Sequence, residues 1–249
     1  MEIRFDEQVA IVTGAGRGLG RSHAIAMASK GAKVVVNDFS GSNVISENAK
    51  SVVQEITSAG GEAIAHGANV ANFDQVQSMV NETIDKWGRV DILVNNAGIL
   101  RDKTFLKMSV EDMREVIDVH LMGSLNCSKA VWEIMREQSY GRIVLTSSSS
   151  GLYGNFGQTN YGAAKMAMVG VMNTLHLEGM KYNIKVNCLA PTAGTAMTDG
   201  LFPEPVFKLM PPESVSPGVV FLCSEDAPSR KVLAAGGGSF AIFKGFETE

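Results

Sequence analysis

Short runs of β-branched residues alternate along this chain with longer stretches that have the spacing of amphipathic helices. The runs are Val9–Val12, Lys33–Asn37, Ile92–Asn95, Arg142–Thr146 and Ile184–Leu189. Each is apolar at its centre, as in strands that are covered on both faces of a parallel sheet. The helical stretches cover about 19–30, 46–59, 73–87, 110–138 with a break, and 161–182. This alternation predicts βαβ units and an α/β fold with a parallel sheet.

No feature of the sequence divides the chain into separate units. It lacks a fixed-period repeat and a Ser/Pro-rich linker, so we expect one domain over residues 1–249. The prolines cluster between Pro191 and Pro228, which predicts an irregular lid over a binding site at about 191–217. Its apolar residues suit a mobile lid and equally suit ordinary loop packing: Met197, Leu201, Phe202, Phe207, Leu209 and Met210.

Composition excludes several classes of protein. With 22 basic and 26 acidic residues the net charge is −4, and 45% of residues are hydrophobic, which is typical of a globular domain. There is no basic stripe, so we expect neither nucleic acid nor a membrane as a partner. The chain starts without a basic segment followed by an apolar stretch, and it does not end in a Ser-Lys-Leu address. These features predict a cytoplasmic protein.

Neither the cysteines nor the histidines suggest a metal site. Cys127, Cys188 and Cys223 are widely spaced, and we expect reduced core residues. The spacing of His23, His66 and His176 does not match a metal-ligand pattern, so no metal is expected.

A glycine-rich turn joins the first strand to the first helix. It contains Gly14, Gly16, Gly18 and Gly20, interleaved with Arg17 and Leu19. Glycines let the backbone turn sharply and approach a pyrophosphate, while free N–H groups at the helix start face the anion. A (β/α)8 barrel has a similar length, but this turn favours an open, doubly wound sheet. A tight turn without a ligand is the alternative interpretation.

The second strand ends at Asp38, 18 residues after Gly20, where a carboxylate would bind ribose hydroxyls. A carboxylate there repels a 2′-phosphate, and the next ten residues contain no Arg or Lys to reverse the charge. NAD is therefore the expected cofactor rather than NADP. Capping of the turn that follows is the alternative role for Asp38.

A serine, a tyrosine and a lysine form a third pattern. Ser148 follows the fifth strand, while Tyr161 and Lys165 share one helical face because they are four residues apart. A tyrosine hydroxyl has an ordinary pKa of about 10, and a neighbouring ammonium favours its phenolate form. A serine at the strand end could hydrogen-bond a substrate oxygen as charge develops on it. The three residue types suit proton transfer to or from an alcohol or ketone.

In their order along the chain, four segments resemble the short-chain dehydrogenase/reductase family: Thr13–Gly20, Asn95–Gly98, Ser148 and Tyr161–Lys165. The resemblance spans nearly the whole chain. It implies a single-domain Rossmann fold, a doubly wound parallel sheet with helices on both faces. It also implies that Tyr161 is the catalytic acid/base, that Lys165 lowers the pKa of Tyr161 and holds the nicotinamide ribose, and that Ser148 positions the substrate carbonyl.

The resemblance implies further contacts with the cofactor. Asn96, Ala97 and Gly98 would support the adenine side of the pocket, and Pro191 would border the cofactor. Thr195 or Thr198 would bond the nicotinamide carboxamide, and we favour Thr195.

The chain departs from the family pattern at two places. Asn69-Val70 replaces the usual acidic residue before a valine after the third strand, although an amide oxygen can still accept from an adenine amino group. His120 replaces an asparagine that many members use in catalysis. Two interpretations of His120 are open: a water-holding group behind Lys165, or an interior histidine with its hydrogen bonds satisfied.

Other stretches resemble one branch of the family, the (3R)-hydroxyacyl-CoA dehydrogenase unit of the peroxisomal multifunctional β-oxidation enzyme and its stand-alone bacterial relatives. They are Val36–Asp38, Val119–Leu121, Gly154–Tyr161 and Ala190–Thr198. The branch implies a small-molecule substrate, a 3-hydroxyacyl-CoA or another CoA thioester. A dehydrogenase of steroid, aromatic or small ketones is one alternative, and a non-catalytic dinucleotide-binding module is another. The helices at 121–138 and 161–182 resemble those between family subunits, which implies a homotetramer or homodimer.

Overall fold

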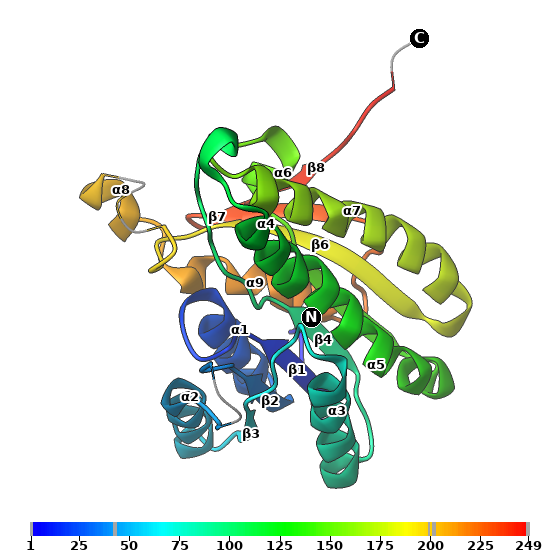
Figure 1. Ribbon diagram of the computed structural model, residues 1–249. Coiled ribbons are helices and arrows are strands. Elements are labelled where there is room, and N and C mark those ends of the chain that lie inside the picture. The colour runs from blue at the N-terminus through cyan, green and yellow to red at the C-terminus, as the bar shows by residue number, and fades with distance from the viewer. Residues whose placement is uncertain (1, 42–43, 199, 201–202, 248–249) are drawn as a thin grey trace.

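One eight-stranded sheet forms the centre of the computed structural model, which describes residues 2–41, 44–198, 200 and 203–247 (Figure 1). The strand order is β3-β2-β1-β4-β5-β6-β7-β8, and all neighbours are parallel except β7 and β8. The strands are β1 Val9–Thr13, β2 Lys33–Asn37, β3 Glu62–His66, β4 Ile92–Asn95, β5 Gly141–Thr146, β6 Ile184–Thr192, β7 Val232–Gly236 and β8 Ser239–Phe243.

Helices cover both faces of the sheet, and each face has its own apolar core. On one face are α1 Gly18–Ser29, α2 Glu47–Ser58 and α9 Ser216–Cys223. On the other are α3 Phe73–Trp87, α5 Gly123–Gln138 and α7 Thr159–Gly179, which lie side by side in Figure 1. Alternate residues of β1 illustrate the division, since Ala10 and Val12 join the first core and Ile11 joins the second. The central strands are therefore apolar on both faces, and the doubly wound α/β fold is confirmed.

The remaining helices are short. They are α4 Val110–Ile117, α6 Ser149–Tyr153 and α8 Glu204–Lys208, with short 3₁₀ turns at Phe105–Lys107, Met180–Tyr182 and Pro212–Ser214. The expected break within 110–138 is a π-helical turn at Asp118–Met122 between α4 and α5. π-turns of this kind are rare and often occur at functional sites.

The direction of winding reverses between β1 and β4. The chain proceeds from β1 outward to β3 and then crosses back to place β4 beside β1. In open α/β sheets, ligands bind beyond the carboxyl ends of the strands at such a reversal. The glycine turn and Asn95–Gly98 follow these two strands, so the fold brings both segments to this point.

The last two strands form a hairpin. It consists of β7 and β8, with Gly237 and Gly238 at its tip. Both tip glycines have positive φ, 54° and 77°, which a two-residue hairpin turn requires. The Gly-Gly pair was the available signal for this turn. The strand β3, which none of the quoted apolar runs covered, has a mixed burial pattern because it lies at the sheet edge.

Three further findings concern predictions made above. Cys127, Cys188 and Cys223 are buried free thiols, as expected of core residues. None of the described helices has the length and apolar character needed to cross a membrane. Leu201 and Phe202 of the expected lid lie outside the described residues.

Candidate functional site

The glycine turn between β1 and α1 has a backbone conformation that residues with side chains would not fit. Gly14 and Gly18 have φ of 61° and 54°, in the left-handed region that favours glycine. A Cβ on Gly14 would lie 2.8 Å from the Ala97 Cα, and one on Gly20 would lie 2.1 Å from the Gly14 carbonyl oxygen. The turn is therefore packed tightly from behind by its own backbone and by the loop after β4.

Asn96 holds this turn in place. Its Nδ2 donates to the carbonyl oxygens of Thr13 and Gly14, at 3.0 and 3.1 Å. In return, the Thr13 hydroxyl accepts from the backbone N–H groups of Asn96 and Ala97, at 3.0 and 3.1 Å. The two loops at the sheet's reversal point are thus joined into one rigid support, which is what a pre-formed ligand site requires.

A cleft of about 490 Å³ opens beside the glycine turn. Eleven predicted residues line it: Gly14, Arg17, Gly18, Leu19, Gly20, Asp38, Asn69, Val70, Asn96, Ala97 and Gly98. Thr195 lines it as well, from the segment after β6. Of the other predicted cofactor residues, Gly16, Tyr161, Lys165 and Pro191 are not on its wall.

Seven lining residues were not predicted as cofactor contacts: Asn37, Phe39, Ala68, Ile99, Val119, Ala196 and Met197. Most of them adjoin a predicted residue, since Asn37 and Phe39 flank Asp38 and Ile99 follows Gly98. Their position next to a motif was the available signal. Ala68 directly precedes the predicted Asn69, and its carbonyl oxygen accepts from Asn37 Nδ2 at 3.0 Å.

The segment after β6 distinguishes the two candidate threonines. The Thr198 hydroxyl donates to the Ala193 carbonyl oxygen at 2.7 Å and accepts from the Thr195 N–H at 2.8 Å, so it is committed to its own turn. Thr195 lies on the cleft wall opposite Gly18, where a Cβ on that glycine would be 3.5 Å from the threonine Cγ2. The geometry therefore favours Thr195.

Asn69 has a local partner for the oxygen that was expected to accept from adenine. Its Oδ1 accepts from the Ala71 N–H at 3.0 Å, and its own N–H donates to Gln75 Oε1 at 2.9 Å. The second lone pair of Oδ1 is what remains for a ligand.

Ser148, Tyr161 and Lys165 come together next to this cleft. Ser148 precedes α6 and accepts from the Ser150 N–H at 3.2 Å. Tyr161 and Lys165 are in the first half of α7, with the Lys165 Nζ 5.5 Å from the centre of the tyrosine ring. The Nζ donates to the Thr146 carbonyl oxygen at 2.7 Å, and the Lys165 carbonyl accepts from Ser147 Oγ at 2.8 Å.

The electrostatics of this group differ from the expectation. Burial raises the pKa of the Tyr161 phenol, and this outweighs the hydrogen bond with Ser148, which lowers it. Burial also lowers the pKa of the Lys165 ammonium to about 7. We expected Lys165 to depress the tyrosine pKa, but a lysine that loses its charge near neutral pH is a weak source of positive potential. In the protein alone the phenol is therefore neutral.

His120 connects the cleft to the tyrosine. It is buried on the π-turn, and its Nε2 lies 2.8 Å from the Ile99 carbonyl oxygen and 3.1 Å from the Ile99 N–H. Its ring lies directly against Gly98, where a Cβ would be 2.3 Å from the histidine Cε1. Burial, followed by the nearby Lys165 charge, lowers the pKa of His120 to about 3. The imidazole is therefore neutral.

Comparisons with known proteins agree with this geometry. A family model described as short chain dehydrogenase matches residues 8–205. The chain belongs to the short-chain dehydrogenase family. As members of that family do, it acts as an oxidoreductase on CH–OH groups.

Three relatives each align with at least 90% of this short-chain dehydrogenase. A short-chain type dehydrogenase/reductase of Mycobacterium tuberculosis is 49% identical over 93% of this chain and 83% of its own. The peroxisomal multifunctional enzyme type 2 of Drosophila melanogaster is 48% identical over 90% of this chain, which spans only 38% of that enzyme. The structure of a 7α-hydroxysteroid dehydrogenase, complexed with NADH and 7-oxo glycochenodeoxycholic acid, has a TM-score of 0.86 at 30% identity and covers 94% of this chain and 95% of that one.

The residues of this dehydrogenase fit a dinucleotide. The glycine turn leaves no room for a side chain at Gly16, because a Cβ there would overlap the Asp38 carboxylate, 2.3 Å from its Oδ2. That carboxylate also borders the cleft, beyond the carboxyl end of β2. A phosphate cradle and a ribose acceptor are therefore present in one cleft.

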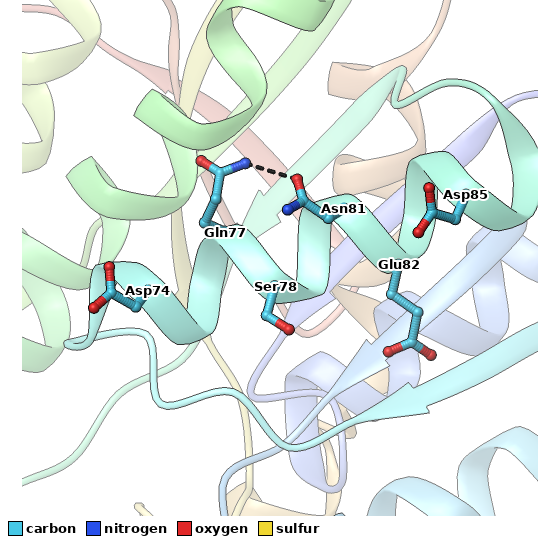
Figure 2. A pocket seen from close by; sticks show the side chains of 6 residues that line it. All are labelled: Asp74, Gln77, Ser78, Asn81, Glu82 and Asp85. Carbon is cyan, nitrogen blue, oxygen red and sulfur yellow. Dashed lines mark hydrogen bonds between the residues drawn. The ribbon is translucent and has the colours of Figure 1, made fainter.

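A second hollow, on the outer face of α3, has no comparable chemistry. Its six polar side chains are spread along one helix rather than directed at a common point (Figure 2), and Gln77 and Asn81 bond each other at 3.0 Å. Among the residues that the structure describes, no group of three or more potential ligands could hold a metal ion.

Proposed function

We propose that this short-chain dehydrogenase uses NAD to interconvert a secondary alcohol and a ketone, and that its substrate is a 3-hydroxyacyl-CoA and the corresponding 3-oxoacyl-CoA. Two observations support the proposal: the Asp38 carboxylate lies on the cleft wall, and the Tyr161 ring contacts His120, which packs against Gly98 of the same wall. A carboxylate at the ribose end favours NAD because it repels a 2′-phosphate.

Tyr161 acts as the acid and base of the proposed reaction. In the direction of reduction, its neutral phenol donates a proton to the ketone oxygen, and the raised pKa described above keeps that proton in place at neutral pH. Ser148 donates a hydrogen bond to the same substrate oxygen. In the direction of oxidation, the phenolate of Tyr161 accepts the alcohol proton. When bound, oxidised nicotinamide supplies the hydride acceptor and a positive charge that favours the phenolate.

Lys165 orients the proposed site from the end of β5. Its hydrogen bond to the Thr146 carbonyl directs the ammonium along the end of β5, next to the tyrosine ring. The remaining two N–H donors of Lys165 are suited to the hydroxyls of a nicotinamide ribose.

The assignment of an acyl-CoA rests on the branch resemblance and on exposed apolar side chains near the site. Leu106 is 94% exposed and Phe156 is 88% exposed, on two segments that are joined by the hydrogen bond from the Lys103 N–H to the Gly157 carbonyl. Leu209 is also exposed, and Met197 lines the cleft. We propose that residues 191–217 form a lid and that an acyl chain covers these side chains.

The proposed assembly is a homodimer or homotetramer. On α7 the apolar side chains of Met166 and Leu177 are exposed, and Met180 is exposed directly after the helix. A second copy that packs along α5 and α7 would cover them. Light scattering coupled to gel filtration measures the mass directly.

A second candidate substrate is a steroid-like ketone. The 7α-hydroxysteroid dehydrogenase structure covers 94% of this chain, so a bulky ring ketone is compatible with the same fold. A non-catalytic dinucleotide module is the third candidate.

The first experiment follows NADH consumption with purified protein. Acetoacetyl-CoA and a longer 3-oxoacyl-CoA are compared with matched ketones that lack CoA, and with a 7-oxo steroid. Turnover restricted to CoA esters supports the acyl-CoA assignment, and turnover of free ketones alone rejects it. Tyr161→Phe should lose at least about 1,000-fold in kcat while it remains folded, because the proton donor is gone. NADH binding without turnover of any substrate would favour the non-catalytic module.

A further inference from the structure

Ser46 is fixed beside Asp38 by two hydrogen bonds. It precedes α2 and caps that helix, because its Oγ accepts from the Ala49 N–H at 3.0 Å. The same hydroxyl donates to Asp38 Oδ2 at 2.6 Å. A serine hydroxyl has a single proton, so this proton is directed at the carboxylate. Ser46 is buried, whereas Asp38 is half-buried at the cleft wall.

Asp38 is held on its opposite side by the glycine turn. A Cβ on Gly16 would overlap the carboxylate, at 2.3 Å from Oδ2 and 2.5 Å from Cγ. The same Cβ would be 2.9 Å from the Asn48 Cβ on α2. The start of α2 and the glycine turn therefore enclose the carboxylate, and its free movement is toward the cleft.

A closed loop places Ser46 at this position. Phe39 and Ile45 form an isolated antiparallel bridge, and the Ser40 hydroxyl donates to the Val44 carbonyl at 3.0 Å. The loop also rests on Gly67, where a Cβ would lie 3.2 Å from the Val44 carbonyl oxygen. These contacts bring Ser46 next to Asp38, which lies eight positions earlier in the chain.

We infer that Ser46 is a positioning residue that sets cofactor selectivity by holding the Asp38 carboxylate toward the ribose hydroxyls. With Oδ2 bonded to Ser46, the carboxylate cannot swing aside to admit a 2′-phosphate. The Ser46 hydroxyl also occupies one lone pair of Oδ2, so Oδ1 is the better acceptor for a ribose hydroxyl. This inference rests on the proposed use of NAD, and it adds a residue outside the cleft wall that determines the preference.

The test compares kcat/KM for NAD and for NADP in Ser46→Ala with the same alcohol substrate. We expect the NAD/NADP ratio to fall about 10-fold, which corresponds to about 1.4 kcal/mol and to one hydrogen bond with a charged group. Ser46→Thr retains both the cap and the donor, so its ratio should stay within about 2-fold of the wild-type ratio. A ratio that is unchanged in Ser46→Ala would overturn the inference.

Ser109→Ala is the matched control for the loss of a helix cap. Ser109 caps α4 by accepting from the Asp112 N–H at 3.1 Å, and it lies beside a carboxylate, that of Asp112. It lines no part of the cofactor cleft. Both serine-to-alanine variants should lose similar stability, but only Ser46→Ala should change the ratio. An equal change in both variants would identify the effect as loss of stability and would reject the inference.

A double-mutant cycle separates this inference from the proposed function. In an Asp38→Ala background, Ser46→Ala should have no further effect on the ratio, because the group it positions is gone. A wild-type enzyme that prefers NADP would refute the proposed function itself. A wild type that prefers NAD, with a Ser46→Ala effect that persists without Asp38, would refute the positioning role alone. If Ser46→Ala does not fold, Ser46→Gly is better tolerated at a helix N-cap and also lacks the donor, and its NAD/NADP ratio should fall about 10-fold.

Discussion

The imidazole of His120 meets the phenol ring of Tyr161 edge to face, with the ring centres 5.1 Å apart and the planes at 90°. The histidine is also packed against Gly98 and bonded to the Ile99 backbone. The buried His120 side chain therefore connects Tyr161, the proposed acid/base, to the wall of the cleft. Its neutral ring adds no charge to the site, so it acts through contact and hydrogen bonding.

Replacing His120 should impair catalysis more than cofactor binding. In His120→Phe the aromatic contact remains while the bond to the Ile99 carbonyl is lost, and we expect kcat to fall about 10-fold with KM for NAD within about 3-fold. His120→Asn can restore a hydrogen bond to Ile99 and should recover part of kcat. Steady-state kinetics on both variants check this. His176→Phe, which changes a histidine bonded to Ser229, serves as the control and should retain wild-type kcat.

Gly98→Ala should be harmful because of His120. The added Cβ would lie 2.3 Å from the histidine Cε1, so one of the two groups must move. We expect a loss of about 1–3 kcal/mol in the free energy of unfolding, as overpacking of a core typically costs. The smaller side chain of His120→Ala in the same chain should restore part of this stability. Urea unfolding of the single and double variants measures the coupling, and simple additivity would show that the contact is unimportant.

Much of the fold could be predicted because it depends on local patterns. The helix at 73–87 was predicted at its observed bounds, since Asn72 caps its start through the Gln75 N–H and Gly88 ends it at φ 74°. The π-turn around His120 could be expected only as a break. Its geometry depends on packing against Gly98 and α7, which a local pattern does not contain.

The site was predictable to a similar extent. The glycines and Asp38 could be placed because backbone and charge requirements restrict the residue types allowed there. Ser46 could not be found, because its contact with Asp38 depends on the loop closed by the Phe39–Ile45 bridge. The predicted direction of the Tyr161 pKa shift was wrong because the sequence does not show burial, which is a property of the folded chain. Burial raises the pKa of Tyr161 and lowers that of Lys165.

Lys165→Met should stabilise the protein while it abolishes turnover. Burial lowers the Lys165 pKa to about 7 against an ordinary value of 10.5, so between these pH values the unfolded chain binds more protons than the folded one. The contribution of Lys165 to the free energy of unfolding therefore rises with pH across that range and is lowest near pH 7. An apolar side chain of similar length removes the cost, and we expect a gain of about 1–3 kcal/mol at pH 7. Thermal unfolding at pH 7 and pH 9 checks the sign, because the gain should shrink at pH 9.

Acid should destabilise the fold through its buried histidines. Burial lowers the pKa of His23 to about 3, and its Nδ1 bonds Ser216 Oγ at 2.9 Å between α1 and α9. From pH 6.5 down to about 3 the unfolded chain binds a proton that the folded chain does not, so stability falls with pH by about 1.4 kcal/mol per unit for each such histidine. His120 behaves in the same way. His23→Gln retains a hydrogen-bonding group for Ser216 without titrating, and urea unfolding between pH 7 and pH 5 should show a shallower slope than the wild type. The same slope in both proteins would mean that His23 does not contribute to acid unfolding.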